Sequence, residues 1–205
     1  LICIGRNYAE HAKELGNSVP KEPLFFLKPD SAILAHRHPL YIPDWTQDVH
    51  HEVELLIRIC RNGKAVQAEF AHRYFDAISL GIDFTARDIQ AEAKANGHPW
   101  EKAKAFDGSA VISKKWFPVD SFTEGWESVP FYLEKNGEKV QSGSALHMTH
   151  HVHALIAHVS KYMTLKMGDV IFTGTPAGVG RVEDGDTLEG FFNEESMFRV
   201  NIHGT

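Results

Sequence analysis

Residues 50–60 read HHEVELLIRIC and place two glutamates at the start of an apolar run. The run predicts a β-strand, in which successive side chains point to opposite faces. Glu52 and Glu54 then share one face, and Val53 lies on the other. Two like charges held side by side repel each other, so this strand needs solvent or a cation in front of its acidic face.

Two explanations satisfy that requirement. In the first, the segment is an edge strand whose acidic residues face water, which is a common arrangement. In the second, the acids bind a divalent cation, because Mg²⁺ and similar ions prefer oxygen ligands. A third ligand would then be Asp83, which ends an apolar strand in GIDFTARDIQ. Asp83 could instead help to begin the next helix, although Thr85 with Asp88 is the better capping pair there, and Gly97 would end that helix.

The remaining pattern is rich in strands. KNGEKV predicts a hairpin with an Asn-Gly turn. A helix is expected over residues 7–16, with Asn7 as its N-cap, and a longer amphipathic helix over 146–163. No repeat or long linker interrupts the chain. We therefore expect one domain over residues 1–205, of the α+β class and mostly β, with a few helices outside curled sheets.

Composition excludes several classes of protein. The 205 residues carry a net charge of -6, which argues against a nucleic-acid binder. No apolar run reaches the roughly 18 residues of a membrane helix, so no membrane partner is expected. Cys3 and Cys60 form no metal-finger or disulfide pattern. A cytoplasmic location is therefore the expectation.

Five motifs occur along the chain in one order: CIGRNYAEHAKEL, HHEVELLIRI, GIDFTARDIQ, KAKAFDGSAVIS and LKMGDVIFTGTPAGVG. Together they resemble the fumarylacetoacetate hydrolase superfamily in its short, single-domain form. The resemblance implies a β-sandwich roll and, in most relatives, a homodimer. It also implies an Mg²⁺ or Mn²⁺ site whose ligands are Glu52, Glu54 and Asp83. A bound cation would make the glutamate pair tolerable.

The same resemblance implies a catalytic set. His11 and Glu14 are three residues apart, so they can pair on one helix face, either as an incidental pair or as a general base and its partner. Acylpyruvate hydrolases and oxaloacetate decarboxylases of the superfamily carry a similar His-x-x-Glu on a lid helix. Lys104 matches the site lysine of the family, and we expect it on a strand face that it shares with Lys102.

Three further residues are expected to bind substrate. Arg87 and Gln90 match an ARD-Q run of the family, and Arg87 could hold a carboxylate or form a structural ion pair. Thr175 belongs to the glycine-rich segment TGTPAGVG, whose N–H groups could hold a carboxylate or form a simple tight loop. The histidines of 147–158 suggest a transition-metal site, an interface or neither.

These residues predict a metal-dependent hydrolase or decarboxylase of small 2-keto or 1,3-diketo acids. An isomerase of 2-hydroxy-dienedioates would use the same metal and enolate chemistry without breaking a C–C bond. A non-enzymatic ligand binder of the same fold is the third alternative, which the complete acid–base set disfavours.

Overall fold

The computed structural model describes residues 1–14, 16, 18 and 20–204, and its strands form three sheets. The largest contains, in spatial order, β2 (Leu24–Leu27), β1 (Ile2–Gly5), β12 (Val170–Phe172), β5 (Val53–Ile59), β6 (Phe75–Asp83) and β8 (Ala110–Ile112), and β9 (Phe117–Pro118) also pairs with β6. The second contains β11 (Glu138–Gly143), β10 (Phe131–Lys135), β14 (Thr187–Phe192), β15 (Glu195–His203) and β3 (Leu40–Tyr41). The smallest contains β13 (Gly180–Arg181), β4 (Val49–His51) and β7 (Thr85–Ala86).

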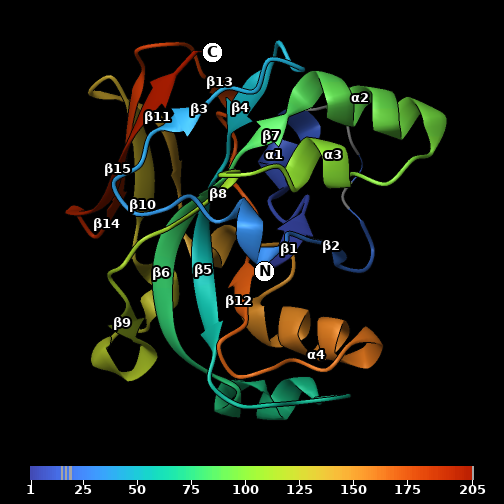
Figure 1. The fold of residues 1–205 in the computed structure, drawn as a ribbon. Coiled ribbons are helices and arrows are strands. Elements are labelled where there is room, and N and C mark those ends of the chain that lie inside the picture. Colours follow the sequence, from blue (N-terminus) through green and yellow to red (C-terminus); the bar gives the residue numbers. More distant parts are fainter. Residues whose placement is uncertain (15, 17, 19, 205) are drawn as a thin grey trace.

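Helices are few and short, which confirms the mostly β class. The α-helices are α1 (Ala9–Glu14), α2 (Arg87–Asn96), α3 (Glu101–Lys104) and α4 (Val152–Tyr162). Short 3₁₀ helices cover Asp30–Ala32, Ala68–Arg73, Val119–Ser121, Trp126–Ser128 and Ala145–His147. Figure 1 shows the five-stranded sheet on one side of the long, curved β5–β6 pair, with α2, α3 and α4 on the other. None of the helices in the described ranges is long and apolar enough to span a bilayer.

Strand β5 lies between β12 and β6 in the interior of the largest sheet. From Val53 to Ile59, its odd-numbered residues are buried in the main hydrophobic core. On the other face Leu56 packs in a second apolar cluster. The acids on that face are buried too, with Glu52 only 5 % and Glu54 only 1 % exposed. The explanation of a solvent-facing edge strand is therefore wrong.

The Asn-Gly hairpin is confirmed between β10 and β11. Asn136 and Gly137 both have positive φ, at 56° and 83°. These are the left-handed conformations that a two-residue hairpin turn requires.

The expected helix over 146–163 begins only at Val152, and Leu146 is 58 % exposed instead of packed. The cause is Asn7, whose Nδ2 donates to the His150 carbonyl oxygen and whose Oδ1 accepts from the His150 N–H, at 3.0 and 2.8 Å. Asn7 also donates to Thr173 O at 2.8 Å. The prediction of Asn7 as a helix cap is therefore wrong, because its polar atoms hold distant backbone instead. The expected span 7–16 includes Leu15, which lies outside the described residues.

The predicted cap of α2 is also wrong, whereas its predicted end at Gly97 is confirmed by a φ of 67°. Thr85 lies in β7, and its hydroxyl accepts a hydrogen bond from Lys104. The Asp88 carboxylate accepts from the Thr46 hydroxyl at 2.6 Å instead of pairing with Thr85. Helix α2 therefore begins without a side-chain cap.

Candidate active site

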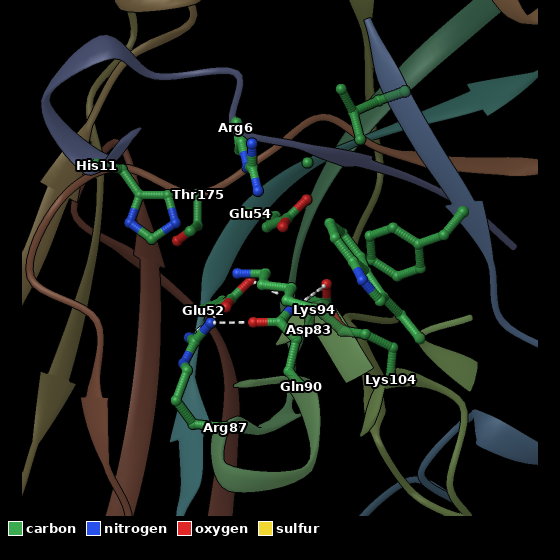
Figure 2. Close-up of a pocket in the computed structure, with 14 residues that line it drawn as sticks. Arg6, His11, Glu52, Glu54, Asp83, Arg87, Gln90, Lys94, Lys104 and Thr175 are labelled. Atoms are coloured by element: carbon green, nitrogen blue, oxygen red, sulfur yellow. Dashed lines mark hydrogen bonds and ion pairs between the residues drawn. The ribbon is translucent and has the colours of Figure 1, made fainter. Parts of the chain in front are cut away.

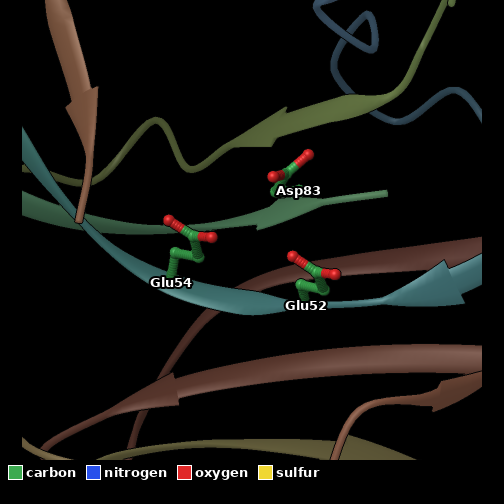
Figure 3. A group of neighbouring side chains, drawn as sticks. All are labelled: Glu52, Glu54 and Asp83. Carbon is green, nitrogen blue, oxygen red and sulfur yellow. The ribbon is translucent and has the colours of Figure 1, made fainter. Parts of the chain in front are cut away.

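Three buried carboxylates converge where β5 and β6 run side by side. Val53 pairs with Ile82, and the Asp83 N–H donates to the Glu52 carbonyl at 2.9 Å, so the two strands align their acidic residues. One ligand atom from each of Glu52, Glu54 and Asp83 lies within 4.8 Å of the others, as Figure 3 shows. No other such group of His, Cys, Asp or Glu occurs in the part of the chain that the structure describes.

Lys104 binds two of these carboxylates. Its Nζ donates to Glu52 Oε2 at 2.9 Å and to Asp83 Oδ2 at 2.7 Å, and it also donates to the Thr85 hydroxyl. Lys104 is buried in the short helix α3, whereas Lys102 on the same helix is exposed. The expectation that both lysines lie on a strand is wrong, but the structure does place Lys104 at the acidic group.

A second buried lysine, Lys28, was not predicted. Its side chain is 0 % exposed, and its Nζ lies 2.7 Å from Asp83 Oδ1 without the alignment of a hydrogen bond. It donates at 2.9 Å to both the carbonyl and the hydroxyl oxygen of Ser109. The one hint in the sequence is the apolar run FFL immediately before it. Asp83 therefore lies between two ammonium groups.

Glu54 is the carboxylate with the weakest compensation. It accepts one hydrogen bond from the Gly174 N–H at 2.7 Å, and it has no ion pair with any residue in the described ranges. Burial, together with the charges of Asp83 and Glu52, raises the pKa of Glu54 well above its usual value. Burial also favours the protonated form of Glu52, but the charges of Lys104 and Arg87 hold its pKa well below the usual value.

This donor set fits a divalent cation. Three carboxylates supply hard oxygen ligands, which Mg²⁺ and Mn²⁺ prefer. Glu54 lacks a positive partner of its own, and Asp83 Oδ1 lacks an aligned hydrogen bond. A cation among the three side chains would compensate both atoms and the repulsion between the carboxylates.

His11 and Glu14 form the expected pair on α1. His11 Nδ1 lies 3.4 Å from Glu14 Oε2, and the Gly178 N–H donates to both oxygens of Glu14 at 3.1 and 3.2 Å. A carboxylate only accepts, so Nδ1 carries the proton and Nε2 keeps its lone pair. Burial lowers the pKa of His11 despite the charge of Glu52 and the hydrogen bond with Glu14. His11 is therefore a neutral imidazole, able to take a proton, at neutral pH.

Arg87, Gln90 and Thr175 also line the pocket. Arg87 donates to Gln90 Oε1 at 2.9 Å and pairs with Glu52 at 2.5 Å. The Thr175 hydroxyl donates to the Val53 carbonyl at 2.8 Å, so it serves the backbone of the acidic strand. In the glycine-rich segment, the Gly174 N–H donates to Glu54 and the Gly178 N–H donates to Glu14. Both groups therefore bind carboxylates of the chain itself.

One pocket brings most of these side chains together, and they are His11, Glu52, Glu54, Asp83, Arg87, Gln90, Lys104 and Thr175 (Figure 2). Glu14 and Lys28 are not among its lining residues. The lining also includes Arg6, Phe26, Lys94 and Trp100, which sequence reasoning missed. Arg6 lay in the GRNYA run, but nothing there distinguished it from a solvated arginine. Lys94 lay on the apparently solvated face of a helix.

The histidines of 147–158 do not form a metal site. His150 Nε2 lies 3.2 Å from the Pro20 carbonyl oxygen. His158 packs against Phe25 and Tyr162, and His153 lies against Phe75. These contacts explain most of the cluster as packing, with no convergence on one point.

Comparison with known proteins now identifies the family. The family model for the fumarylacetoacetate (FAA) hydrolase C-terminal domain matches residues 1–202. The chain belongs to this family.

Its relatives act on keto acids. An oxaloacetate tautomerase of Escherichia coli (strain K12) is 42% identical over 197 residues, covering 96% of this chain and 90% of that protein. A mitochondrial oxaloacetate decarboxylase of Dictyostelium discoideum is 41% identical over 190 residues, covering 92% of this chain and 86% of that protein. The crystal structure of Pseudomonas aeruginosa fumarylpyruvate hydrolase, in complex with Mn²⁺ and pyruvate, matches with a TM-score of 0.91 and 33% identity over 100% of this chain and 89% of that one.

Proposed function

We propose that this protein is a divalent-metal-dependent enzyme of small 2-keto acids, and that its principal reaction interconverts the keto and enol forms of oxaloacetate. One observation carries the proposal: the buried, neutral imidazole of His11 lies in the same pocket as three buried carboxylates. One of these carboxylates, that of Glu54, has no ion pair with a basic side chain in the described residues. The relatives supply the substrate class, whereas the sequence predicted C–C bond hydrolysis or decarboxylation, with isomerisation of a 2-hydroxy-dienedioate as the alternative.

Glu52, Glu54 and Asp83 would hold Mg²⁺ or Mn²⁺. The cation, when bound, supplies Lewis-acid polarisation of the keto group. The Mn²⁺ in the P. aeruginosa relative supports this choice of ion for the site.

The side chains of the chain itself can move the proton. His11 Nε2 would take a proton from C3 of the keto acid and then give it to the keto oxygen, which completes the enol. The reverse transfers restore the keto form, so tautomerisation consumes no other reactant. Glu14 would hold the ring in the required tautomer, because it is anchored by the Gly178 N–H. Lys104 would stabilise negative charge on the keto oxygen, and Arg87 would orient a substrate carboxylate.

Cleavage of a C–C bond is the second candidate. Decarboxylation of oxaloacetate would release CO₂ and leave the enolate of pyruvate, whose negative charge Lys104 could stabilise in the same way. Hydrolysis of an acylpyruvate would need the His11–Glu14 pair to activate water. A D. discoideum relative named as a decarboxylase and a P. aeruginosa relative named as a hydrolase support it. Isomerisation of a 2-hydroxy-dienedioate would use the proton transfer alone.

The test separates these reactions with one protein sample. Ultraviolet absorbance follows loss of the enol of oxaloacetate, a coupled lactate dehydrogenase assay follows pyruvate release, and acetylpyruvate tests hydrolysis, each with Mg²⁺ or with EDTA. We expect Mg²⁺-dependent loss of the enol that exceeds pyruvate release, and a roughly 10²- to 10⁴-fold fall in His11→Ala. The exposed His36→Ala is the matched control.

Each other outcome assigns a different function. Equal rates of enol loss and pyruvate release would make decarboxylation the principal reaction. No turnover of either acid by the parent protein would reject the proposal and favour a ligand binder.

A homodimer and a cytoplasmic location stay predictions. Exposed Ile33, Tyr41 and Trp45 line one groove on the surface and support association with a second copy, which analytical ultracentrifugation would test. The mitochondrial D. discoideum relative makes localisation a question for microscopy of the tagged protein.

A further inference from the structure

Two cationic side chains in the pocket have no role in the chemistry proposed above. Arg6 and Lys94 both line it, yet neither side chain forms an ion pair or hydrogen bond with any residue that the structure describes. Arg87 and Lys104, in contrast, are each bound to Glu52. Cations that the protein leaves without a counter-charge in a pocket are suited to an anionic ligand.

The charge of the lining indicates how many negative charges that ligand carries. Four cationic side chains face three carboxylates, so the pocket has a formal excess of one positive charge. A divalent cation at the acidic group would raise the excess to three. A 2-keto monocarboxylate neutralises one of these charges, whereas a dicarboxylate neutralises two. The electrostatics therefore favour a doubly charged ligand.

Arg6 and Lys94 approach the same space from different walls. Figure 2 shows Arg6 reaching into the pocket from the side opposite Lys94 and Arg87. Lys94 stands on α2 with its Nζ 5.4 Å from the centre of the Trp100 ring, which limits where its ammonium group can lie. Burial, followed by the charge of Arg6, lowers the pKa of Lys94 to about 8, so the two side chains are close enough to repel each other. Lys94 is still mostly protonated at neutral pH.

We propose that Arg6 and Lys94 form a subsite for the second carboxylate of a dicarboxylic 2-keto acid. The pocket then selects 2-keto dicarboxylates over monocarboxylates of equal length. The inference rests on the proposed function for its placement of the first carboxylate and the keto group at the acidic residues.

A pair of stable ligands tests the subsite without turnover. N-oxalylglycine and N-ethyloxamate share the oxamate head and have the same length, and only the first carries a distal carboxylate. Isothermal titration of the Mn²⁺-loaded full chain would give both dissociation constants. We expect the parent to bind N-oxalylglycine ~10- to 100-fold more tightly, which is the range of charge-assisted hydrogen bonds.

The variants locate the discrimination. Lys94→Met should weaken N-oxalylglycine about tenfold and leave N-ethyloxamate within about twofold, and Lys94→Arg should restore most of the loss. Arg6→Met should behave like Lys94→Met. Lys102→Met, which removes an exposed lysine from the neighbouring helix α3, is the matched control for net charge. Retained binding of N-ethyloxamate shows that each variant is folded.

Equal binding of the two ligands by the parent, or an equal loss of both in Lys94→Met, would overturn the subsite. The result is separable from the proposed function. Discrimination that depends on Lys94 in a protein that turns over no keto acid would retain the subsite and reject the function. Turnover of oxaloacetate without such discrimination would do the reverse.

Discussion

Replacing Lys28 with methionine removes the buried ammonium group that faces Asp83 and keeps most of the apolar stem. The Lys28 side chain is 0 % exposed, and it is bound to Asp83 at 2.7 Å and to two oxygens of Ser109. The substitution leaves a buried carboxylate oxygen and the two Ser109 oxygens without this donor. Removing one partner of a buried pair costs about 3–5 kcal/mol of unfolding free energy. For a chain of this length that corresponds to a fall in Tm of roughly 6–20 °C.

Differential scanning calorimetry in EDTA would measure this effect without interference from bound metal. Lys115→Met is the matched control, because Lys115 pairs with Glu195 at 2.7 Å but both side chains are about half exposed. The control should lose no more than about 1 kcal/mol. Asp83→Asn on the Lys28→Met background should recover part of the loss, since it removes the unpaired charge.

A loss in Lys28→Met as small as that in Lys115→Met would refute the reasoning. It would mean that water or a rearranged side chain compensates Asp83. A large loss with no recovery in the double variant would assign the effect to Ser109 instead of the ion pair.

Three further outcomes are expected. Burial, followed by the charges of Asp83 and Glu52, raises the pKa of Glu54, so the metal-free protein should lose stability as pH rises through that pKa. Melting curves should therefore show that Mg²⁺ raises Tm more near pH 8 than near pH 5, and an equal rise at both pH values would contradict this. Burial lowers the pKa of His11, so turnover should fall only when the pH drops to that lowered pKa. Glu14→Gln removes a charge that raises the pKa of His11, so the acidic limb of its rate profile should move to lower pH, and an unmoved limb would contradict the pairing. Asn7→Ala removes three hydrogen bonds and should cost about 2–4 kcal/mol in denaturant unfolding, whereas a loss below about 1 kcal/mol would show that these bonds hold little.

Strand periodicity is local, so it predicted that the two glutamates share a face, and the resemblance to the family added Asp83 as the third acid. Glu52 and Glu54 are two residues apart, so any strand places them on one face, and Asp83 ends the neighbouring strand along the chain. The hairpin at Asn136 and the helix end at Gly97 were predicted for the same reason, since each depends on the left-handed backbone of one or two residues.

The errors occurred where distant polar groups compete for the backbone. The helix pattern over 146–163 is genuine, but Asn7 holds the backbone of His150 and delays the helix. Thr85 and Asp88 satisfy the spacing of a capping pair, yet Lys104 and Thr46 bind them instead. No local rule contains these partners.

The sequence by itself determined that two carboxylates share a strand face, that a third follows another strand, and that the chain is mostly β. Tertiary structure alone decided that these acids are buried, that Lys28 and Lys104 neutralise them, and that Arg6 and Lys94 face the same pocket. The physical reason is range. Periodicity and turn conformation depend on neighbours along the chain, whereas burial and charge pairing depend on segments that meet only when the sheets close.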